Sequence, residues 1–224
     1  MNDELVLAAA VRNNVEWCDA MCRAHGIAGE ADDDAWIWPV RTPPYYPDAV
    51  TLRPSGSAAA VLARIDAGPG CSIKDSFATL HLPGFEVIVE GSWLYRPSGP
   101  ARGAEWSAVT ASELPEWERA WGEPRGLFVP ALLANAQFVA ARSGGRIVAG
   151  AILNRSDDVV GISNVFGGDW AGAAATAARL YPGMPLVGYA AGDDLAAASR
   201  QGFEVVGPLR VWMRVDRPRR SPSV

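Results

Sequence analysis

The chain has 224 residues, of which 49% are hydrophobic, and a formal net charge of −5. That length and apolar content suffice for one large or two small globular domains with a buried core. The acidic balance offers little to a nucleic-acid backbone, and no stretch reaches the ~18 consecutive apolar residues of a membrane span. Because the first residues are acidic, unlike a signal peptide, we expect a cytoplasmic protein without nucleic-acid or membrane partners.

In the first half, hydrophobic periodicity and turn residues predict a helix, an ordered loop that ends in a short strand, a second helix and a long strand. Their expected ranges are residues 4–25, 29–54 (strand 49–52), a helix that starts after residue 55 or 57 and runs to 67, and 85–95. Ser55 or Ser57 is expected to cap the second helix.

Cysteine and histidine side chains gather on one face of the first helix. Cys18, Cys22 and His25 have the spacing and the residue types that suit zinc. They also continue an apolar stripe, and free cysteine is a common core residue, so we favour core packing and expect no metal. The odd total of three cysteines indicates free thiols, not a disulfide framework.

The second half begins after residues 97–103, which are rich in Pro and Gly and have the composition of a linker. Strands are expected at 105–109, 138–142, 146–153, 159–166, 186–189 and 203–214, and helices at 112–121, at 170–180 and from Asp193. Ser112 is expected to cap the first of these helices and Asp193 the last. Short turns make the strands from 138 to 166 antiparallel neighbours, whereas the strand–helix–strand order after residue 159 favours parallel pairing.

These boundaries divide the chain into an N-terminal α/β half (1–98), a C-terminal domain (104–216) and a flexible tail (217–224). A short match links the two halves. Gly84-Phe85, with Trp93 downstream, parallels Gly202-Phe203, with Trp212 downstream. The first half is therefore either a degenerate copy of the second or a chance match.

The element order over residues 105–214, with the Gly202-Phe203 corner near its end, resembles the GNAT superfamily of acyl-CoA N-acyltransferases. The resemblance implies a GNAT-like α/β (α+β) fold with a mixed sheet. A tandem, in which the N-terminal half is a degenerate GNAT-like copy, is one version of this fold. The whole chain also resembles a bacterial group with a GNAT-like C-terminal half and an extended N-terminal half. Trp17-Cys18-Asp19, Tyr46-Pro47-Asp48 and Lys74-Asp75-Ser76-Phe77 carry that second resemblance.

In GNAT enzymes the backbone of a splayed strand holds the pantetheine arm of coenzyme A, and the next helix N-terminus receives the pyrophosphate. The resemblance therefore implies a coenzyme A or acetyl-CoA site made of Asn164, Val165, Phe166, Gly167, Gly168, Trp170, Ala171, Gly172 and Ala173. Asp169 departs from the family signature, which has Arg or Gln there, and it brings negative charge toward a diphosphate.

Acyl transfer to an amine also needs a base and an acid. The tyrosine that GNAT enzymes often place four residues before the Gly-Phe corner is replaced by Ala198, and Tyr189 is the alternative candidate acid. Lys74, the one lysine of the chain, lies beside Asp75, and the pair suits either a substrate-orienting or a tuned catalytic role. A surface salt bridge at a turn is the alternative.

Candidate substrate contacts are the polar residues set among aromatics or beside the lysine: Asn14, Tyr46, Asp48 and Ser76. The leading hypothesis is transfer of an acetyl group from acetyl-CoA to an amine of a small molecule by direct attack. The alternative is a GNAT-fold protein that has lost coenzyme A and binds a small ligand or catalyses another reaction between the halves. A homodimer is expected because sheet edges need covering.

Overall fold

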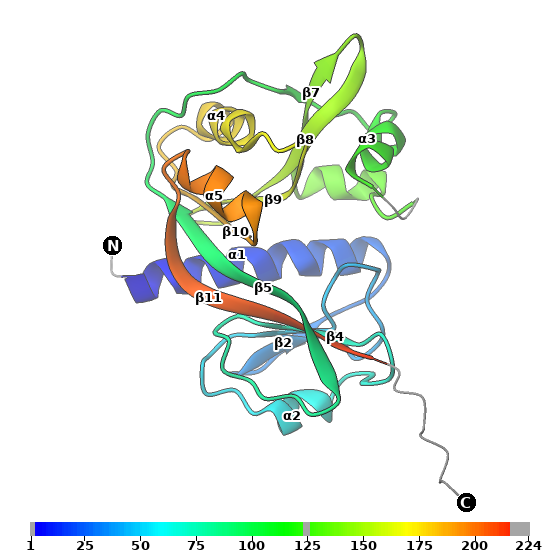
Figure 1. The fold of residues 1–224 in the computed structure, drawn as a ribbon. Helices are drawn as coiled ribbons and strands as arrows, with labels where there is room; N and C mark the ends of the chain where they lie inside the picture. The colour runs from blue at the N-terminus through cyan, green and yellow to red at the C-terminus, as the bar shows by residue number, and fades with distance from the viewer. Residues whose placement is uncertain (1–2, 123–125, 216–224) are drawn as a thin grey trace, which may run out of the picture.

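The computed structural model describes residues 3–122 and 126–215 (Figure 1). The expected tail, 217–224, lies outside them. The helices are α1 (Asp3–Ala24), α2 (Ala58–Leu62), α3 (Leu114–Trp121), the 3₁₀ helix η1 (Pro130–Ala134), α4 (Trp170–Leu180) and α5 (Asp193–Ser199). The strands are β1 (Glu30–Ala31), β2 (Ala35–Ile37), β3 (Ala49–Thr51), β4 (Ser72–Asp75), β5 (Phe85–Arg96), β6 (Ser107–Ala108), β7 (Gln137–Ser143), β8 (Arg146–Arg155), β9 (Val160–Phe166), β10 (Leu186–Ala190) and β11 (Glu204–Arg214).

The strands of the described residues form one mixed sheet in the order β1-β2-β3-β4-β11-β5-β10-β9-β8-β7-β6. This arrangement confirms the mixed α/β class expected from the sequence. The antiparallel pairing of β7, β8 and β9 and the parallel pairing of β9 with β10 are also confirmed. No helix among the described residues has the length and apolar character needed to cross a membrane.

The two halves of the chain exchange strands in the middle of this sheet. β5, from the first half, lies between β10 and β11, while β11, the last strand, lies between β4 and β5. The two long strands pair antiparallel, with Glu90 opposite Arg210, and they cross the centre of the molecule together (Figure 1). The halves therefore share one continuous sheet.

Helices cover both faces of the sheet, and the residues of β8 show the division. Ile152 packs in the core cluster with α1 and α3, whereas Ala151 and Leu153 pack in the cluster with α4 and α5. Successive strand residues point to opposite faces, so this alternation places α1 and α3 on one side and α4 and α5 on the other. The candidate site lies on the α1 side.

Side-chain amides attach α1 to the turn between β8 and β9. Asn13 Nδ2 donates to the Asn154 carbonyl at 3.1 Å and to Ser156 Oγ at 2.7 Å, and Asn154 Nδ2 donates back to the Asn13 carbonyl at 3.1 Å. Both asparagines are buried. Gly161 leaves room for them, since a Cβ there would lie 1.9 Å from Asn13 Oδ1.

The structure differs from the sequence-based expectations at several places, and it contains a strand at residues 72–75 that was not expected. Residues 72–75 form the buried strand β4, because pairing with β3 and β11 outweighs the polar character of the segment. α3 and α5 begin after Glu113 and Gly192 and have no side-chain cap, so Ser112 and Asp193 are not caps. α2 is capped by Ser57, as expected, but ends at Leu62, five residues early.

We expect Asn13→Ala to lower the free energy of unfolding by ~1–3 kcal/mol, because it leaves the buried Asn154 carbonyl without its donor. Chemical denaturation of the wild type and the variant measures this. Asn135→Ala is the control, since Asn135 is exposed. Equal losses in the two variants would contradict a specific role for the α1 attachment.

The three cysteines are buried and free. Burial raises the pKa of each thiol, for Cys71 to about 12 with the nearby Asp48 carboxylate as a further cause. The thiolate is the reactive form, so the folded protein holds its cysteines unreactive at neutral pH. The thiols of the unfolded chain lose their protons at a lower pH than those of the folded protein. The free energy of unfolding therefore falls as pH rises from ~8.5 toward 12.

We therefore expect Ellman's reagent at about pH 8, just below the ordinary thiol pKa, to label no cysteine of the native protein within minutes. All three should react once the chain is unfolded in guanidinium chloride. Rapid labelling of one thiol under native conditions would show that its surroundings open locally.

Candidate functional site

The parallel strands β9 and β10 pair over only the first part of their length. Their pairing runs from Val160 opposite Leu186 to Ile162 opposite Gly188 and ends there. Beyond that point β9 continues to Phe166, paired only with β8, and β10 continues to Ala190, paired only with β5. The backbone of residues 163–166 is therefore unpaired on the side that faces β10, which leaves amide and carbonyl groups for a ligand.

A bulge in β9 causes this separation. Ser163 lies opposite Ile152 and Phe166 opposite Gly150, so two residues of β9, Asn164 and Val165, oppose the single residue between them on β8. Asn164 has φ 52°, in the left-handed region that asparagine tolerates better than most residues. Such a bulge bends its strand and redirects a side chain.

A cavity of about 810 Å³ reaches the separated strands from the α1 side. Its walls come from the 41–48 loop, from β4, β5 and β11, and from Trp121 at the end of α3. Asn164 and Tyr189, from the two separated strands, also line it. Most of the exposed lining is apolar, as is usual for small-molecule sites.

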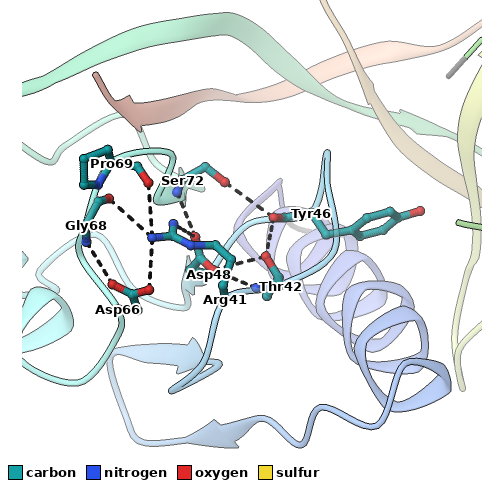
Figure 2. A network of polar contacts seen from close by, with 8 residues as sticks. All are labelled: Arg41, Thr42, Tyr46, Asp48, Asp66, Gly68, Pro69 and Ser72. Atoms are coloured by element: carbon teal, nitrogen blue, oxygen red, sulfur yellow. Dashed lines mark hydrogen bonds and ion pairs between the residues drawn. The ribbon is translucent and has the colours of Figure 1, made fainter. Parts of the chain in front are cut away.

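The 41–48 loop is held in place by the buried Asp48 carboxylate (Figure 2). Asp48 Oδ1 accepts from the Thr42 amide at 3.0 Å and Oδ2 from the Ser72 amide at 2.9 Å, while Arg41 Nη1 pairs with Oδ2 at 3.0 Å. Figure 2 shows the Tyr46 ring pointing away from this network. Asp48 thus fixes the loop that presents Tyr46.

At its inner end the cavity continues into a recess of about 40 Å³ between α1 and the separated strands. Five of the residues expected at a catalytic, cofactor or substrate site line this recess: Asn14, Tyr46, Lys74, Asn164 and Tyr189. Trp17, Cys18 and Ser163 line it as well. The tertiary structure thus brings together side chains that lie more than a hundred residues apart in the sequence.

Lys74 is the cation of the recess. Its side chain is only 4% exposed, and its Nζ donates to Asn14 Oδ1 at 2.8 Å and lies 4.3 Å from the centre of the Tyr189 ring. Among the described residues no carboxylate forms an ion pair with Lys74. The alternative of a surface salt bridge at a turn was therefore wrong.

Tyr46 and Cys18 remain protonated beside this ammonium group. Burial raises the pKa of the Tyr46 phenol well above its ordinary value, so the hydroxyl stays a hydrogen-bond donor. Burial also raises the pKa of Cys18, which makes the thiol a poor nucleophile. The described residues that line the recess thus offer no activated group for a covalent acyl-enzyme.

Asp75 and Ser76 lie apart from the cavity. Asp75 alternates with Lys74 along β4 and faces the opposite side, where its carboxylate accepts from the Leu80 amide at 2.8 Å and from the Thr79 amide at 3.2 Å. Ser76 is fully buried, and its amide donates to Thr51 Oγ1 at 2.8 Å. Both residues stabilise the end of β4.

The segment expected to receive a pyrophosphate begins with two exposed glycines and ends in a helix start that is already capped. Gly167 and Gly168 are exposed and have φ values of 76° and 70°. Asp169 then caps α4, accepting from the Gly172 amide at 2.9 Å. Trp170 and Ala173 are buried in the core under α4, so their side chains are not open to a ligand.

Cys18, Cys22 and His25 form no metal centre. Both cysteines pack in the core with α3, and His25 Nε2 lies 2.8 Å from the Leu127 carbonyl. The described residues contain no group of three or more His, Cys, Asp or Glu side chains positioned to hold a metal ion.

Sequence reasoning missed Trp17 and Trp121 as lining residues and did not place Lys74 on a strand. Trp17 occupies the helix face shared with Cys18, and only the packing of α1 against β9 and β10 turns that face toward the recess. The mixture of aromatic and polar residues between Arg41 and Asp48 was the useful signal.

No protein-family model matches the sequence, and no curated protein matches it significantly. The fold, in contrast, has clear structural relatives. A GCN5-related N-acetyltransferase from Kribbella flavida aligns with a TM-score of 0.61 and 17% identity over 92% of this chain and 95% of that one. A putative GNAT-family acetyltransferase from Novosphingobium aromaticivorans aligns with a TM-score of 0.55 and 16% identity over 89% and 96%.

A functionally unknown conserved protein from Staphylococcus epidermidis is also similar, with a TM-score of 0.56 and 11% identity over 84% of this chain and 93% of that one. At these identities the likeness concerns the fold, and it extends over most of both chains in each case. The protein therefore has the fold of the GNAT superfamily of N-acetyltransferases.

Proposed function

We propose that the protein is an N-acyltransferase that moves an acetyl group from acetyl-CoA to an amine of a small molecule by direct attack. The observation that carries this proposal is the separation of β9 from β10 after Ile162 and Gly188, with a cavity opening onto it. A gap of this kind, between parallel strands and ahead of a helix N-terminus, can hold an extended chain with an anionic end.

The residues around the gap fit coenzyme A in two respects. The unpaired backbone of residues 163–166 offers hydrogen bonds to the amides of a pantetheine arm. The exposed Gly167-Gly168 turn leads into α4, whose aligned peptides place partial positive charge at its start. Bound there, acetyl-CoA would supply the acyl group and a thiolate leaving group.

Two features oppose this fit and favour a second candidate function. The Asp169 carboxylate occupies the Gly172 amide that an anion would use, and the Trp106 indole lies so close to Gly172 that a Cβ there would be 2.2 Å from Nε1. A GNAT-fold protein that has lost coenzyme A and binds a small ligand in the cavity would retain these contacts without penalty. A measurement of coenzyme A binding distinguishes the two candidate functions.

Tyr189 is the candidate acid for the departing thiolate, since it lines the cavity beside the gap, on the strand that leaves β9. Its ring is fixed by an edge contact with Trp93, at 5.7 Å between centroids. Ala198, in the position of the usual tyrosine, is fully buried in the core and has no part in the chemistry.

We expect Tyr189→Phe to lower kcat by ~100-fold or more while leaving KM for acetyl-CoA within a small factor, because it removes a proton donor and keeps the ring. Release of free coenzyme A measures the rate. The Tyr181→Phe variant, from the end of α4 and outside both cavities, is the control. An unchanged kcat in Tyr189→Phe would exclude Tyr189 as the acid.

We further expect acetyl-CoA to raise the melting temperature, by roughly 5–10 °C at a hundredfold excess over Kd. Asp169→Asn should tighten binding by about fivefold, since it retains a capping oxygen while removing a repulsion of ~1 kcal/mol. Isothermal titration calorimetry measures the affinities.

Asp157→Asn is the matched control, because it removes the same charge from an exposed turn at the other end of β9. If neither coenzyme A nor acetyl-CoA binds the wild type or Asp169→Asn at millimolar concentration, the transferase function is wrong and the ligand-binding alternative stands.

A further inference from the structure

We propose that the recess binds a carboxylate carried by the acceptor, which makes the acceptor an α-amino acid with an apolar side chain. The reaction assigned to this acceptor rests on the proposed transferase function. The carboxylate site itself rests on three observations: an uncompensated buried cation, unused hydrogen-bond donors and the size of the recess.

The buried ammonium of Lys74 has no counter-charge among the described residues. Asp48, the carboxylate of the adjoining cavity, is already engaged by Arg41 and by the Thr42 and Ser72 amides. Removing an ammonium group from water costs more free energy than its contacts with one amide oxygen and one aromatic ring contribute. An anion placed against Nζ would offset that cost.

Two further buried donors face the recess without a well-formed hydrogen bond. Tyr46 is 6% exposed and Trp17 is 2% exposed, and neither Tyr46 Oη nor Trp17 Nε1 makes a hydrogen bond of good geometry within the described residues. The Trp17 and Asn164 side chains lie near the Tyr46 hydroxyl and only partly offset the rise that burial causes in its pKa. Buried donors left unpaired are rare and need an explanation. With Lys74, they present one positive charge and two neutral donors to the same small space, which suits a planar anion with two oxygens.

The size of the recess limits the group it can take. Its 40 Å³ exceeds the ~10–15 Å³ that a single water requires, so a carboxylate fits and a diphosphate does not. The recess also shares Lys74, Asn164 and Tyr189 with the larger cavity. An amine on the carbon next to the bound carboxylate would therefore lie beside the gap between β9 and β10, where the acyl group is expected.

The larger cavity indicates the nature of the acceptor's side chain. Beyond the recess its walls are formed mainly by Pro43, Pro44, Tyr45, Ile88, Trp121 and Met213. The Tyr45 and Trp121 rings pack edge to face at one side of this wall, with 5.3 Å between their centroids. Such a surface favours an aliphatic or aromatic side chain over a charged one.

The test compares amino acids with their amides in the absence of acetyl-CoA, so that it does not depend on transferase activity. Calorimetry with L-leucine, L-methionine and L-phenylalanine and their three amides is done at about pH 6.5, where the amino group of every ligand is largely protonated. At least one acid should bind tenfold or more tightly than its amide. Lys74→Met should abolish the preference, and Tyr46→Phe should reduce it several-fold.

Arg210→Met is the matched control, because it removes an equal charge from β11, outside the cavity, where Arg210 Nε pairs with Glu90 at 3.0 Å. It should retain the full preference for the acid. Melting curves check the folding of each variant, and Tyr46→Phe, which loses a single oxygen, still tests the site if Lys74→Met is unstable.

Equal binding of acid and amide in all three pairs would overturn the proposal, as would a preference that persists in Lys74→Met. So would a Lys74→Met variant that slows acetylation of acids and amides alike, since Lys74 would then act on the reaction. A preference for acids in a protein that binds no acetyl-CoA would instead support the carboxylate site and refute the transferase function.

Discussion

The exchange of β5 and β11 is the constraint on which the rest of the structure depends. Two strands stand between β4 and β10, and with adjacent strands ~4.8 Å apart this places β4 and β10 about 14 Å apart along the sheet. Only a long side chain from each can meet across that distance, as Lys74 and Tyr189 do. The exchange therefore builds the candidate site from both halves, and neither half contains the recess alone.

The sheet order is also symmetric about the exchanged pair. On one side β4 follows β11 and is parallel to β3, and on the other β10 follows β5 and is parallel to β9. The internal repeat inferred from Gly84-Phe85 and Gly202-Phe203 stays a prediction, and this order supports it. The two parallel pairs differ in their connecting helices, because β9 leads to a Gly-rich turn and the eleven-residue α4, whereas β3 leads to the five-residue α2.

The site combines an opening that suits an acyl carrier with a recess that suits an anion. The opening results from the bulge at Asn164, which ends the pairing of β9 with β10. The recess results from α1, whose buried polar face supplies Asn14 and Trp17 and is fixed by the Asn13 contacts to the β8–β9 turn. Asp169 is the residue at which the resemblance to acyl-CoA enzymes and the local geometry disagree, because the cap that stabilises α4 occupies part of the anion site.

The sequence by itself determined the elements whose signal is local: α1, α4, the meander from β7 to β9, and the parallel order of β9 and β10 all result from periodicity and turn chemistry. It also pointed to Lys74, Tyr46 and Asn164 by rarity and by polar residues in apolar surroundings. Only the tertiary structure decided that β4 is a strand, that β5 and β11 change places, and that these side chains meet. Each of those outcomes depends on pairing between segments far apart in the chain, which leaves no periodic trace in either segment.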